Sequence, residues 1–437
     1  MDPIVFRHKE IETMPQEALK ALQKQKLQKT LEAALKTPFY KERLNGVGIT
    51  RPEDVQTEAD FQKIPYTTKH DLREAFPCGM LAADKADVVR MHASSGTTGV
   101  PTVVYLTQAD LDKAAELNAR SCACTGSTRN DVFQNMMTYG LFTGGLMLHY
   151  GAERLGMMVI PAGSGNTRRQ LQLMKDFRTT VIHATPSYML HMYDKMAEEG
   201  FSLNDFAVKK AYIGAEPHSE DIRKKIESLY GIDAYNSYGL SEMNGPGLAF
   251  ECVYKNGMHL WEDYYIGEII NPETLRPLPD GERGELVLTI LERNGMPILR
   301  YRTRDLTRFI PEPCPCGRTH RRLDRMTGRS DDMLIINGVN VFPSQIEEVI
   351  MKMPEIGNNY LIRVQKQGPL DKLTVKVEVT SSVFTDDTRD LENLQKRIQS
   401  NLQAVVFIRP AVELHEPGTL PVSQGKAVRV IDERKEN

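Results

Sequence analysis

The chain has 437 residues, 41% of them hydrophobic and 26% charged, which is ordinary for a globular protein of two or three domains. A formal net charge of −3 without a basic stripe argues against nucleic-acid and anionic-membrane partners. No apolar run approaches the roughly 18 residues of a membrane span, and the charged N-terminus is unlike a signal peptide, so we expect a cytoplasmic protein.

The first 85 residues predict a helical lead-in. Residues 14–37 are rich in Ala, Leu, Lys and Gln, which favour helix, and this helix should stop at Thr37-Pro38. A second helix should start at Thr68, because Asp71 follows at the spacing of a capping box.

Residues 86–250 alternate apolar strands with helical patterns, which predicts an α/β core with a parallel sheet. The expected strands are Val132–Met137, Met157–Ile160, Thr180–Ala184 and Lys210–Ile213, and the expected helices are Thr167–Phe177, Ser187–Glu199 and Ser219–Tyr230. Ligands of such sheets gather at the carboxyl ends of the strands.

The remaining chain predicts a β-rich part and a separate end domain. Residues 251–330 carry short alternating strands between turn residues, typical of a small antiparallel barrel or sheet. Residues 331–437 predict a compact α+β domain, with a helix after Ser344, strands at Tyr360–Val364 and Leu373–Val379, a helix at Thr388–Val405 and a strand at Val412–His415. We therefore expect an N-terminal domain over 1–330 and a small mobile C-terminal domain over 331–437.

A glycine- and hydroxyl-rich turn between two predicted strands stands out at Ser94–Thr102, Ser-Ser-Gly-Thr-Thr-Gly-Val-Pro-Thr. Such a turn points backbone N–H groups and hydroxyls at one spot, which is how a loop holds phosphate oxygens. It is not a Walker A loop, because the Gly-Lys-Ser/Thr ending and the following helix are missing. A plain hairpin is the alternative.

Further short motifs follow in a fixed order. They are Gly-Ala-Glu-Pro (214–217), Tyr-Asn-Ser-Tyr-Gly-Leu-Ser-Glu (235–242), Arg-Tyr-Arg-Thr-Arg-Asp-Leu-Thr (300–307), Gly-Arg-Ser-Asp-Asp-Met (328–333), Gly-Val-Asn-Val-Phe-Pro (338–343) and Gly-Lys-Ala (425–427). Together with the hydroxyl-rich loop they resemble the adenylate-forming superfamily, and within it the phenylacetate–CoA ligases. The resemblance covers essentially the whole chain.

The resemblance implies an AMP-forming acid–thiol ligase with ATP and CoA as co-substrates and Mg²⁺ as cofactor. A carboxylate attacks the α-phosphate of ATP, pyrophosphate leaves, and the CoA thiol then attacks the acyl-adenylate. Such chemistry needs charge held on the phosphates, a fixed nucleotide and a dry acyl pocket.

The family motifs assign nucleotide-binding roles to residues of this chain. The loop would hold the β- and γ-phosphates, Asp305 the ribose hydroxyls, Tyr238 the adenine, and Glu242 the Mg²⁺ that bridges phosphates. The full set is Ser94, Ser95, Gly96, Thr97, Thr98, Gly99, Gly214, Ala215, Glu216, Asn236, Ser237, Tyr238, Gly239, Asp305 and Arg329. The plainer alternatives are a turn carboxylate at Asp305 paired with Arg302 or Arg304, and a core aromatic at Tyr238.

The resemblance assigns catalysis and domain motion to four residues, Glu242, Arg329, Asp331 and Lys426. Lys426 would reach the carboxylate and the α-phosphate, so Lys426, Glu242 and Arg329 form the expected catalytic set. Asp331 would lie at the hinge on which the C-terminal domain rotates. A surface ion pair between Arg329 and Asp331, and a solvated lysine, are the alternatives.

The expected acyl pocket consists of Tyr139, Gly140, Phe142, Gly144, Ala215 and Pro217. The glycines leave room for a ring on which the two aromatic side chains would stack, which favours an aryl-acetate substrate, while core packing remains an alternative for both. The family loop usually continues Gly-Lys-Pro, but here Val100 takes the place of the lysine that contacts phosphate.

Two closely spaced cysteines, Cys314 and Cys316, predict a structural Zn²⁺ site, because such pairs bind metal in a reducing compartment. Cys252 and His259 would complete a tetrahedral Cys₃His set, with His320 as an alternative to His259. Cys122 and Cys124 lie in a helix-like run and are expected to be core thiols.

Two other functions fit the sequence besides the CoA ligase. One is an adenylation enzyme that loads a carrier protein, and the other is a nucleotide-binding homologue without catalysis, which Val100 suggests. A homodimer is compatible with the sequence.

Overall fold

The computed structural model describes residues 4–94, 102–141, 143–368, 370–381, 383, 388–421 and 428–435. They form two compact units: unit 1 is Met1–Gly163, Thr179–His183 and Tyr235–Met326, and unit 2 is Ser164–Arg178, Ala184–Ala234 and Thr327–Asn437. The domain boundary expected at residue 330 stays a prediction. No helix in the described ranges is long and apolar enough to cross a membrane.

Unit 1 begins with the expected helical lead-in. Its helices are α1 (Lys9–Glu12), α2 (Gln16–Leu35), α3 (Pro38–Asn45), α4 (Glu58–Lys63) and α5 (Lys69–Glu74), with 3₁₀ turns η1 (Pro52–Asp54) and η2 (Lys85–Asp87). The Thr37 hydroxyl accepts a hydrogen bond from Tyr40 N (3.2 Å), so Pro38 both ends α2 and opens α3. The capping box predicted at Thr68 is present.

Three parallel strands of unit 1 confirm the α/β prediction. They are β3 (Val132–Asn135), β4 (Met158–Ile160) and β5 (Val181–Ala184), and β3 pairs with both of the others. The helices α6 (Gln108–Cys124) and α7 (Thr143–Leu155) pack on each other closely, since a Cβ on Gly151 would lie 2.2 Å from that of Asn118. Asn135 ends β3 and therefore lies at the carboxyl edge of this sheet.

The other strands of unit 1 are antiparallel. The series β7 (Asp233–Leu240), β8 (Gly245–Glu251), β9 (Met258–Leu260), β14 (Arg322–Leu323) and β13 (Phe309–Ile310) is paired in this order, with the turn η4 (Ser241–Met243) between β7 and β8. A second sheet holds β10 (Tyr265–Ile270), β11 (Gly284–Ile290) and β12 (Tyr301–Thr307), which is the expected β-rich part. A hairpin of β1 (Val88–Ser94) and β2 (Thr102–Thr107) precedes α6.

Unit 2 contains the buried strand β6 (Lys210–Gly214) and the helices α8 (Thr167–Asp176), α9 (Pro186–Met196) and α10 (Glu220–Tyr230), with the turn η3 (Leu203–Asp205). The helix α9 contacts both α8 and α10. Ser219 caps the N-terminus of α10 by accepting from Ile222 N, and Gly231 ends the helix with a φ of +66°.

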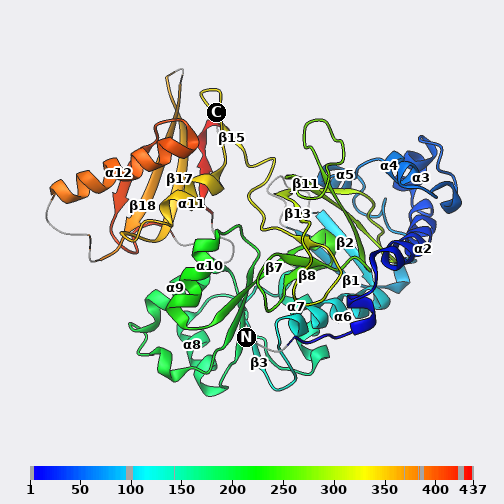
Figure 1. The fold of residues 1–437 in the computed structure, drawn as a ribbon, viewed down its shortest axis with the longest axis horizontal. Helices are drawn as coiled ribbons and strands as arrows, with labels where there is room; N and C mark the ends of the chain where they lie inside the picture. Colours follow the sequence, from blue (N-terminus) through cyan, green and yellow to red (C-terminus); the bar gives the residue numbers. More distant parts are fainter. Residues whose placement is uncertain are drawn as a thin grey trace. The chain divides into compact units, whose positions relative to one another are not determined.

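The C-terminal part of unit 2 is the expected α+β fold (Figure 1). A sheet in the order β19 (Ala411–His415), β18 (Leu370–Val379), β17 (Ile356–Gln367) and β20 (Val430–Asp432) shares one hydrophobic core with α11 (Pro343–Ile350) and α12 (Thr388–Val406). The sequence did not predict β20 or the hairpin of β15 (Leu334–Ile336) and β16 (Val339–Val341).

Candidate functional site

Tyr238 and Asp305, 67 positions apart in the chain, lie side by side in unit 1. The Tyr238 hydroxyl donates to Asp305 Oδ2 at 2.6 Å, which joins β7 to β12. The pairing of Asp305 with Arg302 or Arg304 in a turn is wrong, because Asp305 lies within a strand and both arginines pair with Glu285, at 2.7 and 3.6 Å. The two motifs that the resemblance links through the nucleotide are therefore in contact.

Glu242 is buried in η4, directly after the Tyr238 strand. Its carboxylate accepts a hydrogen bond from the Tyr301 hydroxyl (3.2 Å), and its backbone carbonyl accepts from Arg293 Nη1. These contacts fix one carboxylate oxygen and the peptide behind it. A second oxygen remains on a rigid turn, which suits a cation ligand.

The residues before Glu242 shape the end of β7. The backbone and side-chain amides of Asn236 donate to the Glu251 carboxylate at 2.8 and 3.1 Å. Ser237 is buried, and its hydroxyl has no hydrogen-bond partner in the described ranges. Gly239 has no room for a side chain, because a Cβ there would lie 1.9 Å from the Gly245 carbonyl oxygen. The motif therefore combines polar groups with a glycine that lets the backbone at Gly239 pack directly against the backbone at Gly245.

Several predicted residues fall outside the described residues: Ser95, Gly96, Thr97, Thr98, Gly99, Phe142 and Lys426. Ser94 is the last residue of β1 and lies opposite Thr102 of β2. The two strands that enter and leave the predicted phosphate loop are therefore adjacent.

One asparagine organises the segment expected to bind the acyl group. Asn135 Nδ2 donates to the Tyr139 hydroxyl (2.9 Å) and to the Gly145 carbonyl (2.6 Å), and its Oδ1 accepts from His183 Nδ1 (3.0 Å). Desolvation raises the pKa of half-buried Tyr139 to about 12 and lowers that of fully buried His183 to about 3, so both are neutral at pH 7.

The glycines of this segment leave open space. A Cβ at Gly140 or Gly144 would meet no described atom within 4 Å, whereas one at Gly145 would lie 2.6 Å from the Thr138 carbonyl oxygen. Gly140 also has a φ of +117°, which side-chain-bearing residues rarely adopt. Gly140 is exposed, so this open space is not by itself a pocket, and the acyl pocket stays a prediction.

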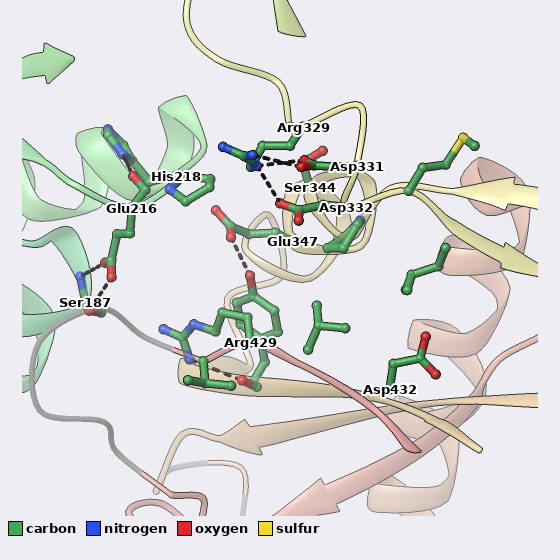
Figure 2. A pocket seen from close by; sticks show the side chains of 18 of the residues that line it. Ser187, Glu216, His218, Arg329, Asp331, Asp332, Ser344, Glu347, Arg429 and Asp432 are labelled. Carbon is green, nitrogen blue, oxygen red and sulfur yellow. Dashed lines mark hydrogen bonds and ion pairs between the residues drawn. The ribbon is translucent and has the colours of Figure 1, made fainter. Parts of the chain in front are cut away.

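In unit 2, the Gly214–Pro217 turn follows β6 directly. Ala215 has a φ of +68°, a strained conformation for a residue with a side chain, and it is exposed with Pro217. Figure 2 shows Glu216 turned towards Ser187, whose N–H and hydroxyl donate to its carboxylate at 2.7 and 3.0 Å. These bonds tie the turn to the N-terminus of α9.

Arg329 and Asp331 form the ion pair given as the plainer alternative, with Nε 2.8 Å from Oδ1 (Figure 2). Both side chains are partly exposed, so this pair adds little stability. Both also line a cavity of about 600 Å³ in unit 2, together with Glu216 and Pro217. The cavity therefore joins two of the predicted motifs.

A buried carboxylate lies at the same cavity. Glu347 of α11 accepts from Ser219 N (3.0 Å) and from the Tyr360 hydroxyl, and burial raises the pKa of this carboxyl. The guanidinium of Arg429 lies 4.5 Å from the Tyr360 ring centre. Residues of α10, α11, β17 and the chain end therefore form one polar cluster (Figure 2).

The four predicted metal ligands come together in unit 1. Cys252, His259, Cys314 and Cys316 are buried, and their ligand atoms all lie within 4.8 Å of one another. The Cys252 and Cys314 sulfurs are 3.6 Å apart, too far for a disulfide bond but close to the roughly 3.8 Å that two 2.3 Å Zn–S bonds at a tetrahedral angle require. Cys316 Sγ lies 3.3 Å from His259 Nε2. The donor set and its geometry fit a tetrahedral zinc ion.

His259, not His320, belongs to this cluster. His259 Nδ1 donates to the His320 carbonyl (3.0 Å), which leaves Nε2 for a metal, as is usual for ligating histidines. His320 is held elsewhere, since its Nδ1 accepts from Glu262 N and its Nε2 contacts the Ile11 carbonyl. Cys122 and Cys124 are buried in α6 outside the cluster, as predicted.

Sequence reasoning missed four polar residues: Asn135, His183, Arg293 and Glu347. None lies in a motif that the resemblance uses, and each has at least one partner from a segment distant in the chain. The one available signal was position, because Asn135 and His183 lie near the carboxyl ends of predicted strands, at the edge where ligands gather.

Family models and relatives agree with this geometry. The model described as AMP-binding enzyme matches residues 8–289, and that of the AMP-binding enzyme C-terminal domain matches residues 338–434. The phenylacetate-coenzyme A ligase of Aromatoleum evansii is 44% identical over 97% of this chain and 96% of its own length, and that of Thermus thermophilus is 43% identical over 98% and 99%.

Solved structures show the fold. A 2-hydroxyisobutyryl-CoA ligase in its postadenylation state, in complex with R3-HIB-AMP, superposes with a TM-score of 0.92 at 29% identity, over 99% of this chain and 93% of that one. The same ligase in its thioesterification state gives 0.72 at 30% identity, over 97% and 91%. The adenylate-forming fold expected from the motifs is confirmed. The chain belongs to the AMP-binding enzymes and, within them, to the phenylacetate–coenzyme A ligase family.

Proposed function

We propose that this protein joins phenylacetate to coenzyme A through an acyl-adenylate, with release of AMP and pyrophosphate. The observation that carries the proposal is the full-length similarity, above 40% identity, to ligases of that name, combined with the Tyr238–Asp305 contact beside Glu242. A carboxylate oxygen attacks the α-phosphorus, and the bond to the pyrophosphate oxygen breaks. The CoA thiol then attacks the acyl carbon and expels AMP.

The nucleotide roles follow from the contacts in unit 1. Asp305 would accept hydrogen bonds from the ribose hydroxyls. The Tyr238 hydroxyl fixes the carboxylate for this task, and its ring would face the adenine. Glu242 would hold Mg²⁺, which neutralises phosphate charge when bound. The loop from Ser94 to Gly99, the Gly214–Glu216 turn, Arg329 and Lys426 keep the roles that the resemblance implies.

The acyl group would lie against the segment that Asn135 holds. Gly140 and Gly144 leave space there, and Tyr139 is oriented by the Asn135 amide. Tyr139 and His183 are neutral at pH 7, so no charge in this segment would oppose an aromatic ring stacked on Tyr139.

The cysteine cluster is proposed to hold a structural zinc ion. Four protein ligands leave no open coordination position, so the ion would take no part in the reaction. Its role would be to fix the turn at Cys314–Gly317 to β9.

Product analysis tests the function. Protein incubated with ATP, Mg²⁺ and phenylacetate should release pyrophosphate, and added CoA should convert the acid to its thioester with formation of AMP. Transfer only to a carrier-protein thiol would favour the carrier-loading alternative, and nucleotide binding without pyrophosphate would favour the non-catalytic one. Formation of ADP would contradict all three.

Asp305→Asn is the matching site test. It removes the negative charge that accepts from the ribose and should raise the KM for ATP at least tenfold. Asp324→Asn is the control, because Asp324 belongs to unit 1 but pairs with Arg308 and Arg283. Equal effects of both substitutions would contradict the assigned role of Asp305.

A further inference from the structure

The buried guanidinium of Arg293 interacts with the Asp110 and Glu242 carboxylates only through space, without a hydrogen bond to either. Its side chain is 2% exposed, Nη1 donates to the Glu242 carbonyl, and Nε and Nη2 have no hydrogen-bond partner in the part of the chain that the structure describes. Burial lowers its pKa to about 10, which still leaves the guanidinium charged at neutral pH. Its Nε–H and Nη2–H groups are buried without an acceptor among the described residues, and a bound anion would supply one.

The backbone beside Arg293 is held rigidly. The Asp110 carboxylate accepts hydrogen bonds from Asn294 N and Gly295 N, both at 2.8 Å. Gly295 packs so closely on β2 that a Cβ would lie 2.6 Å from the Tyr105 carbonyl oxygen. The guanidinium is therefore placed by fixed main-chain contacts, as a preorganised binding group requires.

The location of Arg293 connects it to the predicted phosphate loop. Glu242 belongs to η4, which contacts both β1 and β2, the strands that enter and leave the loop. His92, two residues before Ser94 on β1, is buried with an unpartnered Nε2. Desolvation lowers its pKa, with smaller contributions from the charges of Arg90 and Arg293. Thr102 of β2 likewise has a buried hydroxyl without a partner among the described residues.

The predicted phosphate loop has a valine, Val100, where the resemblance implies a lysine that contacts phosphate. Besides Mg²⁺, a second cation from another part of the chain would therefore be needed to replace that lysine. Nε–H and Nη2–H share one edge of the guanidinium, and this edge binds phosphate oxygens in a bidentate manner.

We propose that Arg293 binds the pyrophosphate end of ATP in place of the missing loop lysine. This inference rests on the proposed function. When the acid attacks the α-phosphorus, the electron pair of the broken P–O bond stays on the leaving pyrophosphate. The guanidinium edge of Arg293 balances that charge and acts in adenylation alone, because thioester formation involves no pyrophosphate.

Separate assays of the two half-reactions test the role. Arg293→Gln keeps a donor for the Glu242 carbonyl but removes the charge, and it should lower the rate of pyrophosphate release about 100-fold. Thioester formation from added phenylacetyl-adenylate should stay within about threefold of the wild type. Arg293→Lys should retain most of the adenylation rate, and Lys113→Met, which removes a half-buried cation that bonds the Glu292 carbonyl, is the matched control.

Rescue distinguishes a charge role from a structural one. The double variant Arg293→Gln with Val100→Lys should adenylate at least tenfold faster than Arg293→Gln alone. Val100→Lys adds a charge and does not repair the packing around residue 293, so a rescue would indicate a charge role. Binding of inorganic pyrophosphate with Mg²⁺, measured by calorimetry, should weaken at least tenfold in Arg293→Gln.

Three results would overturn the inference: equal loss in both half-reactions, no rescue by Val100→Lys, or unchanged pyrophosphate affinity in Arg293→Gln. If Arg293→Gln does not fold, Arg293→Lys alone and Val100→Lys in the wild type still report on pyrophosphate affinity. A wild type that forms no adenylate would contradict the proposed function, but the calorimetric measurement would still decide the role of Arg293.

Discussion

Individual residues at the candidate site are fixed by partners both nearby and far away in the chain. Asn135 holds Tyr139, Gly145 and His183 together, and Tyr238 reaches across 67 positions to Asp305. Each bond is short and buried or half-buried, where a polar group without its partner would be expensive. These contacts therefore fix the positions of side chains that the sequence motifs identify but do not place.

Tyr238→Phe tests one of these bonds. The substitution removes the 2.6 Å hydrogen bond to the Asp305 carboxylate but keeps the ring. Hydrogen bonds to charged groups contribute about 1.5–3 kcal/mol, so the KM for ATP should rise about tenfold or more, with a smaller change in kcat. Tyr264→Phe is the control, since the Tyr264 hydroxyl has no hydrogen bond to any described residue. An unchanged KM in Tyr238→Phe would show that Asp305 needs no help from this hydroxyl.

Because His183 is buried in its neutral form, we expect the folded protein to lose stability in acid. Its pKa is about 3 in the folded protein because of desolvation, and about 6.5 in an unfolded chain. The unfolded chain therefore binds the proton first, and the stability present above pH 6.5 is lost as the pH falls towards 3, by about 1.4 kcal/mol per pH unit. His183→Gln keeps a donor for Asn135 and should flatten this part of the curve of unfolding free energy against pH, measured by urea denaturation. If the wild type and His183→Gln lost stability equally as the pH falls, this role of His183 would be contradicted.

At the scale of elements, the metal turn joins the start of the chain to the β-rich part. Directly after Cys316, Arg318 donates to Glu12 (2.7 Å) and to the Val5 carbonyl, and Thr319 donates to the Met14 carbonyl (2.6 Å). The Arg318–Glu12 pair is almost fully buried. The turn that would carry zinc therefore also anchors α1.

Loss of the metal should thus loosen the N-terminal segment. We expect about one zinc per chain by mass spectrometry, and none after Cys314→Ser with Cys316→Ser. The double variant should melt at a lower temperature, and amides 5–16 should exchange faster with deuterium, because Arg318 and Thr319 lose their fixed turn. Cys78→Ser, which changes an exposed thiol, should keep the metal. Native protein without metal would remove the zinc proposal.

At the scale of the whole molecule, the family's reaction needs two half-reactions from one chain. The 2-hydroxyisobutyryl-CoA ligase has been solved in both a postadenylation and a thioesterification state, and its structures match this chain with TM-scores of 0.92 and 0.72. We therefore expect some residues to act in one half-reaction only. Lys426 is assigned to adenylation and not to thioester formation.

Lys426→Ala should separate the two steps. Removal of the ammonium that would stabilise charge at the α-phosphate should lower adenylation about 100-fold, while transfer from added phenylacetyl-adenylate to CoA should change little. Lys372→Ala, which changes an exposed lysine of β18, is the control. Equal losses in both steps would count against the role of Lys426.

The sequence by itself determined the family, the reaction class and most of the fold, because these depend on local patterns. Strand and helix periods, capping residues such as Thr68, and short motifs in a fixed order need no knowledge of distant partners. The metal cluster could also be predicted from the sequence. Cysteines and histidines at such spacings are usually either metal ligands or core residues.

Only the tertiary structure decided the contacts between distant segments. It placed His259 rather than His320 in the cluster and paired Arg302 and Arg304 with Glu285 instead of Asp305. It also left Nε and Nη2 of the buried Arg293 without hydrogen-bond partners among the described residues. The physical reason is that a buried polar group is defined by whichever donor, acceptor or charge the packing brings within about 3 Å. That distance is set by how strands pair across the sheets, which no local stretch of the chain encodes.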